Sequence, residues 1–187
     1  MLFRSNVTIG KYYRITGEST QDRGVTPDIT IPSLIDATEV GESTRDRALP
    51  WDHIEPAAFK AESDITAPLV GTLTKAHEER TAGSADFRYL RADIGALDAM
   101  RSQKTVSLNL KAREDERKHQ DDDRLARENA LRAAHNEPPV KSLEEIKDDA
   151  SAGIILDEAT QIAGDLAVTT TVRKSGPTQA RRIDGGH

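Results

Sequence analysis

The sequence predicts an α+β chain that is mainly α, with short strands near the N-terminus and a helical domain after them. Two observations carry this prediction. Residues 7–15 are rich in β-branched and aromatic side chains, which is typical of a strand. From Ala67 onward, apolar side chains recur every three or four residues, which is the period of an amphipathic helix.

The strands are expected within residues 7–32. The first strand, 7–15, ends before Gly17, and a polar, turn-rich loop follows. Pro27 fixes its own φ and favours an extended backbone before it, so 29–31 is interpreted as a second short strand. Two such strands are not stable alone in water, and they would need a larger sheet.

Residues 67–172 are predicted to form the helical domain. Ser84 is expected to cap a helix over 84–101, which has the clearest apolar stripe in the chain. That stripe consists of Phe87, Leu90, Ile94 and Leu97. An earlier helix begins at Ala67 and carries Leu69, Leu73, Ala76 and Arg80 at helical spacing.

Further elements are expected after the stripe helix. Alternation at 106–110 predicts one isolated short strand, and 111–136 is typical of a long charged helix. Ser142 and Glu145 form a capping-box pattern that opens a short helix. Asp157 is expected to cap a last helix, whose apolar positions are Ala159, Ile162, Ala163 and Leu166.

Three segments are expected to lie outside the strands and helices. Residues 1–6 are interpreted as a non-native or disordered leader, with the natural sequence beginning near residue 6 or 7. Residues 33–66 are expected to be an ordered connector around Leu49, Trp51 and Phe59. The Gly- and Pro-containing residues 173–187 predict a disordered tail.

Composition excludes several classes of function. The 187 residues are 36% hydrophobic, 4% aromatic and 31% charged, so the core must be lean. A net charge of −6 with no basic face argues against a nucleic-acid partner. The chain has no cysteine, which excludes disulfides and thiolate chemistry. No apolar run is long enough to span a membrane, and no signal peptide is recognised.

Possible metal ligands are better explained as solvated side chains. His119 precedes three aspartates, 121–123, but successive residues of a helix point in different directions and cannot converge on one ion. Only His119 and Asp123 share a face, and two ligands are too few. His77 is followed by two glutamates but lacks the second histidine of a zinc-protease helix. No metal site is therefore predicted.

Candidate nucleophiles have equally ordinary explanations. Ser19 and Thr20 lie in a glycine-flanked loop, but no positioned base accompanies them, so their hydroxyls are expected to bind loop backbone. Asp52 and His53 are adjacent, a geometry that seldom makes an acid–base pair, and a capping or surface role is expected. Trp51 is expected to anchor packed elements rather than to bind a ligand.

Several stretches resemble the tail-specific proteases, a subgroup of the C-terminal-processing serine peptidases. The resemblance covers residues 7–168 and is most specific in Gly-Val-Thr-Pro-Asp-Ile from Gly24, followed downstream by Leu-Pro-Trp-Asp from Leu49. It continues at 105–109 and in Leu-Asp-Glu from Leu156. The residues expected to have structural or interaction roles are Gly24, Pro27, Asp28, Leu49, Pro50 and Trp51.

The resemblance implies that 7–32 closes a protease fold and that a C-terminal helical domain follows. It implies a periplasmic endopeptidase that cuts proteins with apolar C-terminal tails, using a Ser/Lys dyad and neither metal nor organic cofactor. The dyad motifs have no counterpart here, so no catalytic residue is assigned and the chain alone is expected to be inactive.

Expected partners are the upstream protease and PDZ domains of the same protein, and the protein substrates of the full-length enzyme. We therefore expect a non-catalytic scaffold. The alternative is an independent helical module that binds a partner protein.

Overall fold

A computed structural model describes most of the chain: residues 10–35, 40–46, 48–59, 65–146 and 150–174. The chain divides into two compact units, Met1–Ser63 and Asp64–His187, which are described separately below. The leader expected at 1–6, the first residues of the strand expected at 7–15, and 175–187 of the expected tail lie outside the described residues.

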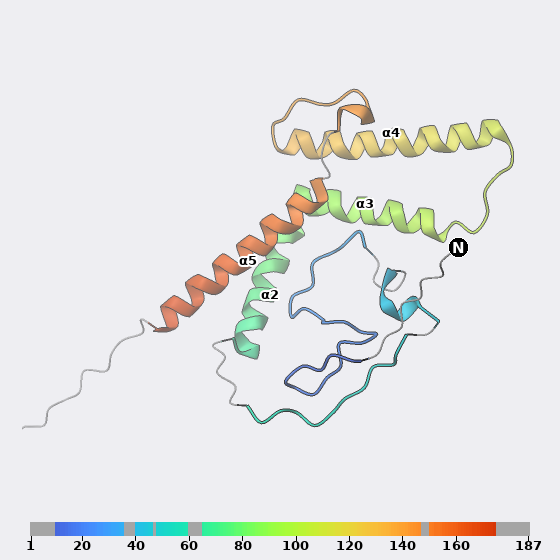
Figure 1. The fold of residues 1–187 in the computed structure, drawn as a ribbon. Coiled ribbons are helices and arrows are strands. Elements are labelled where there is room, and N and C mark those ends of the chain that lie inside the picture. The colour runs from blue at the N-terminus through green and yellow to red at the C-terminus, as the bar shows by residue number, and fades with distance from the viewer. Residues whose placement is uncertain (1–9, 36–39, 47, 60–64, 147–149, 175–187) are drawn as a thin grey trace, which may run out of the picture. The chain divides into compact units, whose positions relative to one another are not determined.

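The unit Asp64–His187, here called the helical unit, confirms the prediction of a mainly helical fold. Within the described residues, α3 and α4 contact each other along their lengths, while α5 contacts both α2 and α3 (Figure 1). The helices are α2 (Ala67–Ala82), α3 (Ala85–Ser102), α4 (Leu110–Ala134) and α5 (Ala150–Lys174), with a short 3-10 helix η2 (Leu143–Glu145) between the last two.

The core of the helical unit is small, as the lean composition predicts. Every helix contributes to it, and Leu90 of α3 has no exposed surface. Its buried apolar side chains are Leu69, Leu73, Phe87, Leu90, Leu131 and Ile154. On α2 the buried face continues from Leu73 through His77 and Thr81, rather than through Ala76 and Arg80. The polar side chains of His77 and Thr81 are thereby buried beside the apolar core.

Two helices have an N-cap side chain, serine in one and asparagine in the other. The Ser84 hydroxyl accepts a hydrogen bond from the Phe87 N–H at 3.4 Å, which confirms the predicted N-cap of α3. Asn109 Oδ1 accepts from the Ala112 N–H at 3.1 Å and caps α4. The isolated strand predicted at 106–110 is not confirmed: Leu110 begins α4, and among the described residues no strand pairs with 106–109.

The last helix begins earlier than predicted. Because α5 starts at Ala150, Asp157 lies inside it and is not its cap. The early start is explained by packing, since Ser151 and Ile154 in the first turns are buried. At the other end α5 continues through Arg173 and Lys174, where the tail was expected to begin.

The η2 turn departs from the capping-box pattern. The Ser142 side chain makes no capping hydrogen bond. Glu145 accepts instead from the Lys141 N–H at 3.2 Å, one residue before the predicted cap.

The unit Met1–Ser63, here called the N-terminal unit, is built from loops in its described part. It has a short 3-10 helix, η1 (Glu42–Thr44), and two isolated antiparallel bridges, Tyr13 with Ser19 and Glu18 with His53. The strands expected at 7–15 and 29–31 are not confirmed, since neither 10–15 nor 29–31 forms a ladder. Isolated extended segments have no sheet to join in the described part of this unit.

Candidate functional site

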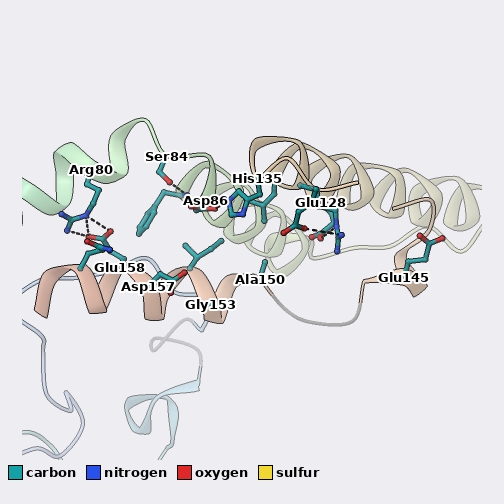
Figure 2. Close-up of a pocket in the computed structure, with 16 residues that line it drawn as sticks. Arg80, Ser84, Asp86, Glu128, His135, Glu145, Ala150, Gly153, Asp157 and Glu158 are labelled. Atoms are coloured by element: carbon teal, nitrogen blue, oxygen red, sulfur yellow. Dashed lines mark hydrogen bonds and ion pairs between the residues drawn. The ribbon is translucent and has the colours of Figure 1, made fainter. Parts of the chain in front are cut away.

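A groove of about 840 Å³ lies within the helical unit, where the ends of all four helices meet (Figure 2). It is lined by the C-terminal turn of α2, the start of α3, the end of α4 and the start of α5. Phe87, Leu131 and Ile154 supply buried apolar surface, and charged side chains supply the rest. The groove therefore combines an apolar base with polar walls, which is the usual chemistry of a binding site.

Glu158 of α5 is one of two buried carboxylates in this groove, the other being Glu128. The Glu158 side chain is 6% exposed, and it accepts hydrogen bonds from two residues of α2. Arg80 donates to it from Nε and Nη2, the latter at 2.7 Å, and His77 Nδ1 lies 2.8 Å from Oε1. Arg80 also donates from Nη1 to Asp165 at 2.9 Å. This cluster of His77, Arg80, Glu158 and Asp165 ties α2 to α5 and is called the Glu158 cluster below.

The cluster keeps Glu158 ionised despite its burial. Burial alone raises the pKa of this carboxyl, but the hydrogen bonds from Arg80 and His77 outweigh it, so the pKa is lowered. The same bonds to Glu158 raise the pKa of Arg80. An ionised carboxylate can only accept, so His77 Nδ1 must carry a hydrogen. The imidazole also packs edge-on against Phe87, with ring centroids 5.8 Å apart.

The charged side chains at the C-terminal end of α4 are also paired. Arg132 donates to Glu128 at 2.8 Å and lies 3.6 Å from Glu137. His135 Nε2 lies 2.6 Å from an oxygen of Asp86, which joins α4 to the first turn of α3. Of these contacts, Arg80–Glu158 and His135–Asp86 join different helices, whereas Arg132–Glu128 lies within α4.

The groove holds a serine, a histidine and an aspartate, but they do not form a nucleophile with its base. The Ser84 hydroxyl accepts from the Phe87 N–H, and His135 pairs with Asp86. Among the described residues no hydrogen bond joins Ser84 to His135. A serine nucleophile needs such a base, so this arrangement can bind but is not set up for acyl transfer.

The other polar motifs of the sequence have ordinary local contacts in the structure. His119 Nε2 lies 3.5 Å from Asp123 on the exposed side of α4, and no group of three potential metal ligands occurs among the described residues. Ser19 Oγ accepts from the Gln21 N–H at 3.0 Å, so its hydroxyl binds loop backbone as predicted. His53 is exposed, whereas Asp52 has a structural role.

Asp52 joins two distant segments of the N-terminal unit. Its Oδ2 accepts from Lys11 at 2.9 Å and from the Tyr13 hydroxyl at 3.1 Å, and its carbonyl accepts from the Ser19 N–H at 3.0 Å. The bond from Lys11 lowers the pKa of Asp52, while burial, aided by the bond to Asp52, raises the pKa of Tyr13. Segments 11–21 and 50–57 are thus held together, and this contact is called the Asp52 clasp below.

The six residues predicted for structural or interaction roles all lie in the N-terminal unit. Gly24 has φ +65°, which favours glycine, and its N–H donates to Thr20 at 3.1 Å. Pro27 and Asp28 are exposed, and Leu49 is half-buried. The Pro50 carbonyl accepts from Lys11 at 2.8 Å.

Trp51, the sixth of these residues, is half-buried. The guanidinium carbon of Arg23 lies 4.2 Å from its ring centroid, close enough for a cation–π contact. The structure therefore places three of the six residues, Gly24, Pro50 and Trp51, in or beside the Asp52 clasp.

Sequence reasoning missed the Glu158 cluster. His77 was judged only as a metal ligand, and no pattern linked it to a residue 81 positions away. One signal was present: His77 is four residues after Leu73, which is four after Leu69, so it continues the buried stripe of α2.

Comparisons with known proteins give the following matches. The family described as the C-terminal domain of tail specific protease matches residues 35–168. A curated relative, the tail-specific protease of Haemophilus influenzae (strain ATCC 51907 / DSM 11121 / KW20 / Rd), is 34% identical over 170 residues. That alignment covers 89% of this chain but only 24% of the relative. In the part of the chain that the structure describes, no helix has both the length and the apolar character needed to cross a membrane.

Proposed function

Because the chain belongs to the family of C-terminal domains of tail-specific proteases, we propose that it is a non-catalytic scaffold of such an enzyme. The enzyme would be a periplasmic endopeptidase with a Ser/Lys dyad that cuts proteins with apolar C-terminal tails. The activity belongs to the remainder of the enzyme, since this chain spans 24% of the relative that it matches. Its partners would be the upstream protease and PDZ domains.

The observation that carries this proposal is the use of polar residues at the groove. In the described residues, the serine and histidine that line it are occupied by a helix cap and an ion pair. The buried carboxylate Glu158 is fully engaged by Arg80 and His77. Groups that are committed to holding helices in place support a structural role better than a chemical one.

The N-terminal unit supports the same proposal from another direction. The Asp52 clasp joins residues 11–21 to 50–57, two segments that lie within the region of resemblance and are far apart in sequence. We propose that the Trp51 ring, stacked beneath Arg23, anchors this region against the protease fold in the complete enzyme.

A peptidase assay tests the proposal. The purified chain should not cleave a peptide with an apolar C-terminus above a buffer blank, while the complete tail-specific protease should cleave it under the same conditions. A variant of the complete enzyme with its catalytic serine replaced serves as the matched negative control. Cleavage by the purified chain that persists through repeated purification would contradict the proposal.

A further inference from the structure

The segment between α3 and α4, residues 104–109, is extended and almost uncovered. Gln103 and Asn109, which bound it, have ψ of 102° and 120°, both in the extended region. Leu108 is 99% exposed and Val106 54%, and Leu110 just beyond the segment is 73% exposed. Single exposed apolar side chains are ordinary, but three at alternating positions in one segment are not.

The main chain of this segment is also unpaired. In the described part of the chain, no N–H or C=O of residues 104–108 takes part in a main-chain hydrogen bond. The apolar side chains of Val106 and Leu108 would share one face of a strand, because side chains of a strand alternate between its two faces, and Leu110 follows at the start of α4. The segment thus has both properties of an added strand: free hydrogen-bonding groups and a two-residue apolar period.

The segment is held at both ends, which limits the entropy lost on pairing. The Gln103 amide donates to Glu116 of α4 at 2.8 Å, and Asn109 caps α4 through its side chain. A short connector fixed in this way loses fewer conformations on binding than a free tail would.

Charge distinguishes the possible partners. Residues 99–113 contain four basic side chains and no acidic one, although the chain as a whole has a net charge of −6. Lys104 and Lys111 have no carboxylate partner among the described residues. Pairing of two copies through this segment would bring like charges together, which is unfavourable. The partner is therefore expected to be acidic beside its edge strand.

A membrane surface fits the observations less well than a sheet edge. The apolar and basic side chains would suit an anionic bilayer, but unpaired main-chain groups are costly in hydrocarbon. A sheet edge satisfies those same groups and covers the apolar face in one step.

We propose that residues 104–109 add as an edge strand to a β-sheet in the remainder of the tail-specific protease to which this domain belongs. That remainder is long enough to contain such a sheet, because this chain covers only 24% of the relative. This inference depends on family membership and not on the proposed lack of activity.

Residue-resolved amide hydrogen exchange, compared between the purified chain and the complete protease, tests this inference. In the complete protease, alternate amides within 104–109 should exchange at least about tenfold more slowly than in the chain alone. The alternation matters because an edge strand directs only every second N–H toward its neighbour. Leu108→Asp in the complete protease should abolish the slow exchange.

The matched control is Leu156→Asp, the same change at another exposed leucine of the helical unit, which is 67% exposed. It should leave exchange at 104–109 unchanged, and the helical circular dichroism of both variants should match the parent. Equal, fast exchange in the chain and the complete protease would overturn the inference. Slowing at consecutive residues would also overturn it, in favour of a longer α4. Slower amide exchange at 104–109 in the chain alone at high concentration would indicate pairing of two copies. Slower exchange only in the presence of anionic vesicles would indicate membrane binding. Either result would overturn the inference.

Discussion

At the scale of single residues, Glu158 links α5 to two side chains of α2. Its carboxylate accepts from Arg80 and His77, and its side chain is 6% exposed. Removing an ionised acceptor from such a site leaves two donors without their partner. The position therefore offers a direct test of whether the Glu158 cluster stabilises the unit.

Glu158→Gln should lower the free energy of unfolding by about 1.5–3 kcal/mol, the range typical of hydrogen bonds to charged groups. The measurement is urea unfolding followed by far-ultraviolet circular dichroism. Glu79→Gln is the matched control. Glu79 is a glutamate of the same helical unit, but its side chain is exposed and its ion pair with Lys75 is long at 3.7 Å. It should change stability by less than about 0.5 kcal/mol. Equal losses for the two variants would show that the cluster has no special role.

Acid should weaken the helical unit through the same residue. The pKa of Glu158 is lowered from 4.5 in the folded state, so its contribution is present above the unfolded value and is lost as pH falls through the folded value. Unfolding free energies measured from about pH 7 to about pH 3 should therefore fall less steeply for Glu158→Gln than for the parent. Parallel curves for the two proteins would contradict this assignment.

The core of α3 gives a second residue-scale prediction. The apolar stripe predicted for α3 includes both Leu90 and Ile94, but Ile94 is half-buried while Leu90 is 0% exposed. Leu90→Ala should therefore cost about 2–5 kcal/mol of stability, and Ile94→Ala should cost clearly less. Chemical denaturation of both variants provides the comparison. An Ile94→Ala loss equal to that of Leu90→Ala would mean that the buried face of α3 is centred on Ile94.

At the scale of elements, the Asp52 clasp depends on one glycine. Gly17 has φ +86°, and a Cβ atom added there would lie 2.1 Å from the Ile54 carbonyl oxygen. That oxygen is main chain and cannot move without breaking the neighbouring bond between the Ile54 N–H and Gly17, which is 2.9 Å long. Close approach and backbone conformation both require glycine here.

Gly17→Ala should therefore open the clasp, whereas Gly24→Ala should add only backbone strain, of about 1 kcal/mol. Gly24 is the matched control because it also has a positive φ, +65°, but has nothing within 4 Å of an added Cβ. Amide exchange at Ile54 and Ala57, whose N–H groups donate across the clasp, should speed up in the first variant far more than in the second. Similar exchange in both would show that strain, and not the close approach, limits the clasp.

Helices were predictable from sequence where one repeating pattern decided them. The starts of α2 and α3 follow from apolar spacing and from the Ser84 cap, both of which are local. The strand predicted at 106–110 is not confirmed, because the Asn109 cap starts α4 at Leu110. The cap predicted at Asp157 is wrong, because packing of the preceding residues extends α5 back to Ala150. Local patterns cannot reveal the Glu158 cluster, because its members are brought together only by the packing of α2 on α5.

At the scale of the whole molecule, the Glu158 cluster and the Asp52 clasp use polar side chains to connect elements that are distant in sequence. Family membership connects the chain to a protease, while the serine and histidine that line the groove are engaged in a helix cap and an ion pair. The segment 104–109 adds a way in which the domain would engage the rest of the enzyme. The central claim is that this domain supports catalysis without performing it.

The most direct test of that claim compares the complete protease with a version that lacks only the region matched to the family, 35–168. Both should be assayed on a folded protein with an apolar C-terminal tail, with the catalytic serine variant as the blank. We expect that deletion of 35–168 abolishes or strongly reduces cleavage, although every catalytic residue is retained. Cleavage by the deleted enzyme at the rate of the complete one would contradict the claim that the domain is a scaffold of the protease.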